Sequence, residues 1–174
     1  MGDGSGDLQR VWHEFAGGLF DGKTILDVGC GRAALSRERL ARGGRNIVTL
    51  QDIDRAIMLV ADLICDVRDL PGKWDIVTAF DVVEHVPDAA KFLKEIGRHA
   101  KDGIFFTTPA KLLYSQPWHF TPEEILDLAG EAKPKGRRLF ARWKSGDSDV
   151  VREVDERQFV TDPTIYAHGA YVGA

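Results

Sequence analysis

Cysteine is scarce in this sequence, with two residues among 174. Two thiols are too few for a disulfide framework, and Cys30 and Cys65 fit better as small buried residues than as metal ligands or nucleophiles. Long apolar runs are also lacking, because none approaches the roughly 20 residues that cross a bilayer. No secretory signal is visible at the start of the chain. We therefore expect a cytoplasmic protein without a membrane span.

An excess of positive charge is absent as well. The chain has 23 Lys and Arg against 27 Asp and Glu, which gives a formal net charge of −4. Because proteins that bind duplex nucleic acid normally present a basic face to the phosphates, we expect no duplex nucleic acid as the main partner. Hydrophobic residues make up 44% of the chain, as in ordinary globular proteins. The length fits one domain over residues 8–174, preceded by a disordered stretch, 1–7.

Short apolar runs alternate with helical segments along the whole chain. The predicted strands cover 24–28, 46–50, 63–65, 74–79, 103–107, 138–144 and 165–172. The predicted helices cover 8–20, 33–42, 89–99 and 122–129. This alternation predicts an α/β fold with a doubly wound, mostly parallel sheet buried on both faces. The last two strands, joined by a local connection, are expected to form an antiparallel pair.

Charge is segregated near the C-terminus. Residues 133–144 hold six Lys and Arg residues, and residues 147–156 hold five acids. Such runs most often form solvated faces, or the arms of a hairpin that pair with each other. A basic strip that docks the acceptor is the alternative.

A glycine-rich turn joins the first predicted strand to a helix. The sequence Val28-Gly29-Cys30-Gly31 follows the strand, and glycines let the backbone turn sharply and approach a ligand without a Cβ atom in the way. The next helix then points its N-terminal N–H groups toward the ligand. Because the third glycine of the dinucleotide fingerprint is Ala34 here, the turn alone does not identify the ligand.

Carboxylates follow the first three strands. Asp27 precedes the glycine turn, and Asp52 lies about 20 residues further on, the spacing of a carboxylate that binds ribose hydroxyls. Asp66 and Val67 offer a carboxylate and a backbone amide to an adenine edge. Because the carboxyl ends of parallel strands meet at one edge of the sheet, these groups are expected to surround a single nucleoside.

Five segments in order resemble the class I S-adenosylmethionine-dependent methyltransferases, in particular the small-molecule (type 11) group. They span residues 24–130 and are ILDVGCG (25–31), Asp52, DVRDLP (66–71), FDVVEHVPD (80–88) and HFTPEEIL (119–126). The resemblance implies a Rossmann-like fold, S-adenosylmethionine as cofactor, S-adenosylhomocysteine as product and a small-molecule acceptor.

The resemblance also implies a set of cofactor-binding residues. They are Asp27, Gly29, Cys30, Gly31, Asp52, Ile53, Asp66, Val67 and Phe80. Within this set, Asp27 and the two glycines would hold the methionine part, Asp52 the ribose diol, and Asp66 with Val67 the adenine. Phe80 would face the cofactor from the fourth strand.

Two departures from the family pattern bear on the acceptor. Only 13 residues separate Asp52 from Asp66, so the helix between them should be a stub or a loop that leaves the adenine pocket open. About 23 residues precede the glycine strand, which makes the N-terminal cap minimal. Acceptor specificity therefore stays open.

His85 and His119 are the candidate catalytic bases, because they lie near the fourth and fifth strands. The aromatic segment 114–120 is either a lid over the acceptor or a packed connector. For His13 on the first helix, a surface or packing role is favoured over a place in the site.

A divalent-metal site is a further alternative. Asp81, Glu84 and His85 have i, i+3, i+4 spacing, and His119 could complete a ligand set. The interpretation without a metal is favoured.

We therefore expect an enzyme that moves a methyl group from S-adenosylmethionine to an oxygen or nitrogen of a small molecule, oxygen being preferred. One alternative is a cofactor-binding but inactive partner or regulatory subunit. The other is an NAD-dependent oxidoreductase, which would explain the glycine turn but neither Asp66 nor the segments 84–87 and 119–124.

Overall fold

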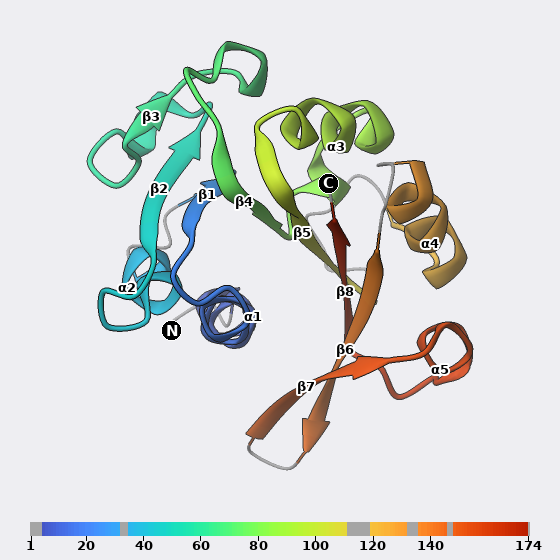
Figure 1. Cartoon of the computed structure of the whole chain (residues 1–174). Helices are drawn as coiled ribbons and strands as arrows, with labels where there is room; N and C mark the ends of the chain where they lie inside the picture. The colour runs from blue at the N-terminus through green and yellow to red at the C-terminus, as the bar shows by residue number, and fades with distance from the viewer. Residues whose placement is uncertain (1–4, 32–34, 111–118, 132–135, 146–147, 174) are drawn as a thin grey trace.

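The computed structural model describes residues 5–31, 35–110, 119–131, 136–145 and 148–173 (Figure 1). Within these ranges eight strands form one sheet in the order β3-β2-β1-β4-β5-β8-β6-β7. The strands are β1 (Thr24–Val28), β2 (Ile47–Asp52), β3 (Leu63–Ile64), β4 (Trp74–Phe80), β5 (Ala100–Pro109), β6 (Arg137–Ser145), β7 (Ser148–Val154) and β8 (Ala167–Gly173). The helices are α1 (Ser5–Leu19), α2 (Ser36–Ala41), α3 (Ala89–Gly97), α4 (Pro122–Glu131) and α5 (Glu156–Thr161), with 3₁₀ turns η1 (Arg55–Ile57), η2 (Val67–Asp69) and η3 (Val83–His85).

The sheet is mixed, and its strand directions confirm the predicted Rossmann-like class. Strands β1 to β5 pair in parallel. Strand β8 is antiparallel to both β5 and β6, so β6 runs in the same direction as β5. The carboxyl ends of β1 to β6 therefore lie along one edge of the sheet.

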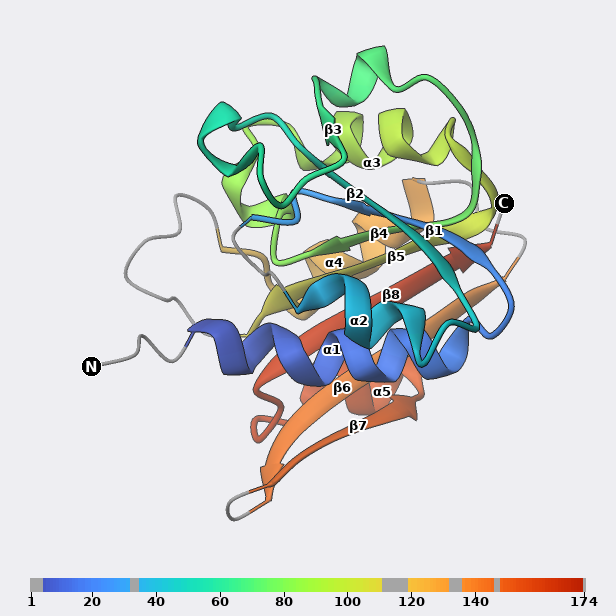
Figure 2. The same ribbon diagram turned by 90° about the vertical axis from the view of Figure 1, so that its left-hand side faces the viewer.

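Helices cover both faces of the sheet (Figures 1 and 2). Trp12 and Ala16 of α1 and Leu40 of α2 pack on one face, while α3, α4 and α5 pack on the other. Neighbouring strand residues alternate between the two layers, as Phe105 and Phe106 do in β5. This double burial explains why the central strands read as continuous apolar runs.

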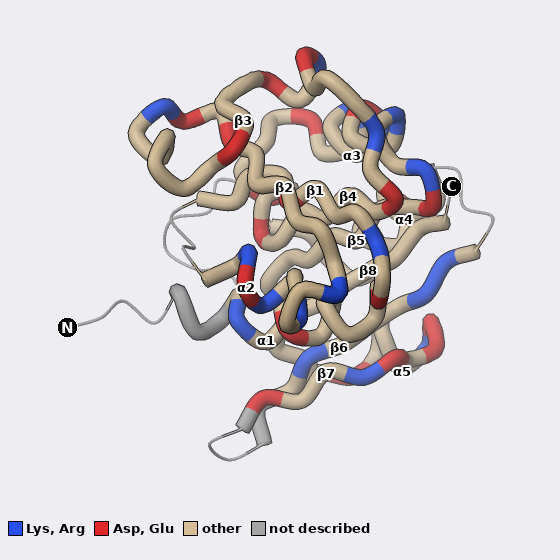
Figure 3. Tube along the Cα trace, turned by 60° about the vertical axis from the view of Figure 1, so that its left-hand side comes forward, with Lys and Arg blue, Asp and Glu red and all other residues tan. Residues whose placement is uncertain are grey.

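Two elements were not predicted as such. Strand β7 occupies most of the acidic stretch and helix α5 begins at its end, so the connection between β6 and β8 contains a strand and a helix. The prediction of paired hairpin arms is confirmed, because β6 and β7 are antiparallel and Arg138 binds Glu153 across them. Figure 3 shows basic and acidic positions interspersed over the described chain.

The shortened β2–β3 connection is confirmed. It contains the single turn η1, which Asp54 caps by accepting a hydrogen bond from the amide of Ala56. At the N-terminus, α1 begins at Ser5 rather than at Leu8, and residues 1–4 of the predicted disordered stretch lie outside the described ranges. No described helix combines the length and hydropathy that crossing a bilayer requires.

Candidate functional site

The register of the sheet brings the predicted strand-end residues to one edge. Asp27 of β1 lies opposite Thr78 of β4, and Val28 lies opposite Gln51 of β2. On the outer side, Asp52 pairs with Ile64 of β3, which is two residues before Asp66. The first three strand ends therefore form one continuous rim.

The glycine turn at this rim has the backbone that the sequence predicted. Gly29 and Gly31 have φ angles of 67° and 55°, in the left-handed region that favours glycine. A Cβ atom on Gly29 would lie 2.7 Å from Cγ2 of Val82. A Cβ atom on Gly31 would meet no described atom within 4 Å, so this glycine borders open space. Cys30 between them is buried, and its amide donates to the carbonyl of Gln51 at 3.1 Å.

Asp52 is fixed beside the turn. Its Oδ2 accepts a hydrogen bond from the amide of Gly31 at 2.9 Å, and its Oδ1 accepts one from the amide of Asp54 at 2.9 Å. The next residue, Ile53, is 68% exposed and adds an apolar surface to the rim.

Gln51 is a part of the site that sequence reasoning missed. Its Oε1 accepts from the amide of Gly29 at 3.4 Å, and its Nε2 donates to the carbonyl of Cys65 at 2.5 Å. The buried amide side chain thus connects the glycine turn to the segment that carries Asp66.

Asp66 caps η2 and forms an ion pair with Arg68. Its Oδ1 accepts from the Arg68 amide at 2.9 Å, and the Arg68 guanidinium donates to both carboxylate oxygens at 2.8 Å. These hydrogen bonds lower the pKa of Asp66 to about 2. A pocket of about 270 Å³ adjoins the carboxylate, and Val67, Val86 and Phe92 are among the residues that line it.

Asp27 is buried at the end of β1, with 1% of its surface exposed. Its Oδ1 accepts a hydrogen bond from the Thr78 hydroxyl at 2.9 Å. Its Oδ2 has no hydrogen-bond partner among the described residues. Burial raises the pKa of Asp27 to about 7, the Thr78 hydrogen bond opposes this shift, and the charge of Asp52 adds to it.

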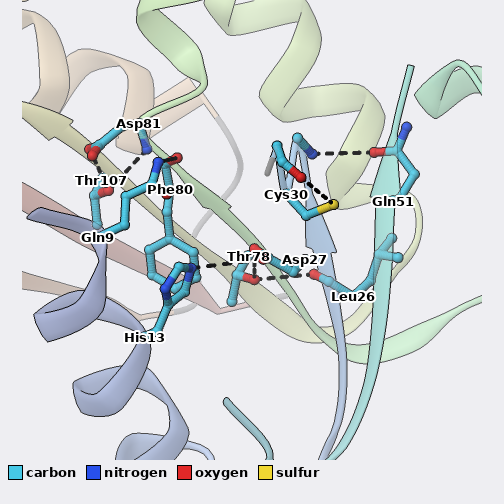
Figure 4. Close-up of polar contacts among 12 residues, drawn as sticks. Gln9, His13, Leu26, Asp27, Cys30, Gln51, Thr78, Phe80, Asp81 and Thr107 are labelled. Carbon is cyan, nitrogen blue, oxygen red and sulfur yellow. Dashed lines mark hydrogen bonds and ion pairs between the residues drawn. The ribbon is translucent and has the colours of Figure 1, made fainter. Parts of the chain in front are cut away.

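His13 of α1 faces this carboxylate (Figure 4). Its Nε2 lies 3.8 Å from Oδ2 of Asp27, and its ring packs edge-on against Phe80 with the centroids 4.4 Å apart. Burial, with a contribution from the charge of Arg39, lowers the pKa of His13 to about 3, so the imidazole is neutral at physiological pH. His13 thus has the packing role that the sequence favoured. It packs against two of the predicted cofactor-binding residues, Asp27 and Phe80.

Phe80 is 3% exposed and lies under α1. Besides His13, its ring contacts Phe105 at 5.9 Å between centroids, and its carbonyl accepts from the side-chain amide of Gln9 at 3.3 Å (Figure 4). Helix α1 thus supplies the wall beside the ends of β1 and β4.

Asp81 continues the rim beyond β4 in a strained conformation. Its φ angle is 54°, which is unusual for a residue other than glycine. The Thr107 hydroxyl donates to its Oδ1 at 2.9 Å, and burial raises the pKa of Asp81. Burial and the neighbouring Asp81 also raise the pKa of Glu84, to about 8.

Comparison with known proteins identifies the family. The model of a family described as a methyltransferase domain matches residues 3–158. The chain belongs to the class I S-adenosylmethionine-dependent methyltransferases.

Curated relatives of this methyltransferase include two ubiquinone biosynthesis O-methyltransferases. The protein from Nitrosomonas europaea is 35% identical over 152 residues, which cover 75% of this chain and 60% of the relative. The protein from Pseudomonas paraeruginosa is 36% identical over 119 residues, which cover 58% of this chain and 50% of the relative. The chain thus spans about half the length of the curated relatives that it matches.

Solved structures of methyltransferases share the fold. One is a possible histamine N-methyltransferase from Thermotoga maritima, with a TM-score of 0.68, 14% identity and coverage of 97% of this chain and 90% of that chain. Another is the plantazolicin methyltransferase BpumL in complex with S-adenosylhomocysteine, with a TM-score of 0.65, 10% identity and coverage of 98% and 85%.

The residues of this methyltransferase fit the cofactor of the family. The free Oδ2 of Asp27 can accept from an ammonium group, and the open backbone at Gly31 leaves room for a ligand. Asp52 and Asp66 supply acceptors suited to hydroxyl and amino groups. A carboxylate at the end of each of β1, β2 and β3 thus matches a nucleoside that carries an amino acid.

The two candidate bases are more exposed than the carboxylates of this cluster. His85 is exposed at the end of η3, and the exposed His119 lies with Nε2 3.2 Å from the carbonyl of Ala110. Most of the predicted lid, residues 111–118, lies outside the described ranges. Across the described chain, no three His, Cys, Asp or Glu side chains gather in a way that could hold a metal ion.

Proposed function

We propose that this methyltransferase transfers a methyl group to an oxygen or nitrogen of a small-molecule acceptor, with oxygen preferred. The observation that carries the proposal is the rim that holds the glycine turn together with Asp27, Asp52 and Asp66 at the ends of β1, β2 and β3. The curated relatives favour oxygen, because they are O-methyltransferases of ubiquinone biosynthesis.

The proposal assigns each part of the cofactor to a strand end. Asp27 and the turn of Gly29, Cys30 and Gly31 would receive the methionine part. The carboxylate of Asp52, already aligned by the Gly31 amide, would accept from the ribose hydroxyls, with Ile53 beside it.

The remaining assignments concern adenine and the wall of the site. Asp66 and Val67 would bind the adenine edge beside the apolar pocket that they line. Phe80, held by Gln9 and His13, would form the wall below the reacting group.

When bound, S-adenosylmethionine supplies a methyl group activated by a sulfonium. The task of the chain is to hold an acceptor in line with that group, since alignment supplies much of the rate in such reactions. A hydroxyl acceptor must also lose a proton to a base. We propose His119 or His85 for this role, because both are exposed near the ends of β5 and β4 and neither ring is enclosed by the core.

Calorimetric titration tests the cofactor assignment. S-adenosylhomocysteine is expected to bind and NAD is not, and binding of NAD alone would favour an oxidoreductase. Incubation with labelled S-adenosylmethionine and a panel of phenols, catechols and amines then separates an enzyme from an inactive partner. Cofactor binding without transfer to any member of the panel would favour the inactive partner.

His119→Ala is expected to reduce turnover at least about tenfold, because a general base typically contributes about 10²–10⁴-fold to the rate. Cofactor affinity should change little, since the base acts on the acceptor and not on the cofactor. Initial rates at saturating cofactor and a titration with S-adenosylhomocysteine measure the two effects. His99→Gln is the matched control, since His99 contacts Gly72 at the opposite edge of the sheet. Equal turnover in His119→Ala and wild type would remove His119 as the base and leave His85 to be tested in the same way.

A further inference from the structure

His13 and Asp27 form a buried polar pair that lacks part of its hydrogen bonding. Each side chain is 2% exposed, and Nε2 of His13 lies 3.8 Å from Oδ2 of Asp27. Neither that oxygen nor Nδ1 of His13 has a hydrogen-bond partner among the described residues. Because burying polar atoms without partners costs free energy, a residue of similar size without polar atoms would pack here more favourably. The pair thus indicates a ligand that completes it.

Helix α1 holds His13 in a fixed place. Trp12 and Ala16 are fully buried against the sheet, and Trp12 packs against Phe105 of β5. Gly17 lets the helix approach α2 so closely that a Cβ atom there would lie 2.5 Å from the carbonyl oxygen of Arg39. The edge-on contact with Phe80 restrains the imidazole itself. The ring is therefore set opposite Asp27 by the packing of a whole helix.

We propose that His13 is a positioning residue for the cofactor, whose imidazole holds the Asp27 carboxylate so that Oδ2 receives the ammonium group of the cofactor's amino-acid end. Thr78 fixes Oδ1 at 2.9 Å, which leaves Oδ2, 3.8 Å from Nε2 of His13, without a hydrogen-bond partner among the described residues and able to accept from an ammonium group. This inference rests on the proposed function, in which Asp27 binds the methionine part.

The groups around the carboxylate set how it responds to pH. Burial is the main cause of the raised pKa of Asp27; the hydrogen bond from Thr78 of β4 opposes it, and the charge of Asp52 of β2 adds to it. Burial, with a smaller contribution from the charge of Arg39 of α2, lowers the pKa of His13 and keeps the imidazole neutral. Since an ammonium group binds the ionised carboxylate, cofactor affinity should rise with pH as Asp27 loses its proton. A polar imidazole beside the carboxylate stabilises its ionised form better than an apolar side chain would, so loss of His13 should move this rise to higher pH.

His13→Leu tests the proposal. The midpoint of the affinity profile is expected to move up by about one unit, because an apolar side chain beside Asp27 disfavours its ionised form. At pH 7 the variant should then bind S-adenosylhomocysteine about fivefold more weakly, since the pKa of Asp27 starts from about 7. His13→Gln places an amide nitrogen near the position of Nε2 and is expected to restore both. Glu14→Gln is the matched control on the same helix, because the Glu14 side chain is 58% exposed and pairs with Arg10.

A second measurement needs no cofactor. Carbon-13 NMR titration of the Asp27 carboxyl in the free protein is expected to show a higher midpoint in His13→Leu than in wild type. In wild type, the nitrogen-15 shifts of the His13 ring should follow the same midpoint, which keeps the test valid if His13→Leu does not fold. Identical Asp27 midpoints, or His13 shifts that ignore that midpoint, would overturn the inference. An even loss of affinity at every pH would show a purely structural role.

The two proposals fail in different ways. If wild type does not bind S-adenosylhomocysteine, the proposed function is wrong, and the NMR titration still decides whether His13 and Asp27 are coupled. If wild type binds it and His13→Leu behaves identically, the proposed function stands and the role of His13 is wrong.

Discussion

The Asp52→Ala variant is expected to bind S-adenosylhomocysteine about 10- to 100-fold more weakly than wild type, a loss of about 1–3 kcal/mol. The carboxylate is held by the amides of Gly31 and Asp54, so it is oriented before a ligand arrives. Removing it takes away the proposed acceptors for two ribose hydroxyls and leaves the Gly31 amide without its partner. Calorimetric titration of both proteins measures the difference.

The control for this variant is Asp54→Ala. Asp54 is an exposed acid two residues away that accepts from the Ala56 amide within η1, and its loss should leave affinity nearly unchanged. Thermal unfolding of both variants separates lost binding from lost folding. Equal affinity in Asp52→Ala and wild type would remove the assignment of β2 to the ribose.

The stability of the cofactor-free protein is expected to fall by about 2–3 kcal/mol between pH 6.5 and pH 8. Burial raises the pKa of Asp27 to about 7 and that of Glu84 to about 8, so the folded state keeps two protons that the unfolded state has lost near pH 4. As pH rises through the folded values, these protons leave and two charges remain buried. The folded state is therefore destabilised relative to the unfolded state.

Two buried histidines act in the opposite sense at lower pH. Burial lowers the pKa of His13 to about 3 and that of His168 to about 4, so between these values and about 6.5 the unfolded state binds protons that the folded state does not. Their effect offsets that of Asp27 and Glu84. We expect a nearly flat stability profile from about pH 4.5 to about pH 6.5.

Urea unfolding across this range measures the profile. Asp27→Asn and Glu84→Gln should each reduce the decline above pH 6.5, because neither amide can ionise. Asp127→Asn, at an exposed position of α4, is the control and should leave the profile unchanged. Stability that holds or rises between pH 6.5 and pH 8 would contradict the burial of these two carboxyl groups in the folded state.

Local sequence predicted the strand ends and the glycine turn well. Asp27, Asp52 and Asp66 each follow a short apolar run, and parallel strands bring such positions to one edge regardless of the details of packing. The positive φ angles of Gly29 and Gly31 follow from residue type. Because these features depend on residues that are neighbours in the chain, the sequence alone was sufficient to predict them.

The partners of these residues depend on tertiary packing and were not predictable in the same way. Thr78 meets Asp27 only through the register of β1 and β4. Gln51 connects two loops across β2, and His13 reaches Asp27 because α1 packs on the sheet. A polar residue within an apolar strand, as Thr78 is, offers a signal that could have been read.

The missed elements have separate causes. Strand β7 carries three charged residues, which hid its β-branched Val150 and Val151. Helix α5 begins after Asp155, whose side chain accepts from the amide of Gln158, and this capping pattern is visible in the sequence. Residues 147–156 were interpreted from their charge alone, although the capping residue Asp155 already indicated a helix.

A crystal structure with S-adenosylhomocysteine tests the central claim most directly. We expect the ribose hydroxyls on Asp52, the ammonium group on Oδ2 of Asp27 and the adenine edge at Asp66 and Val67. A nucleoside bound away from the ends of β1, β2 and β3, or bound there without contact to Asp27 and Asp52, would contradict it.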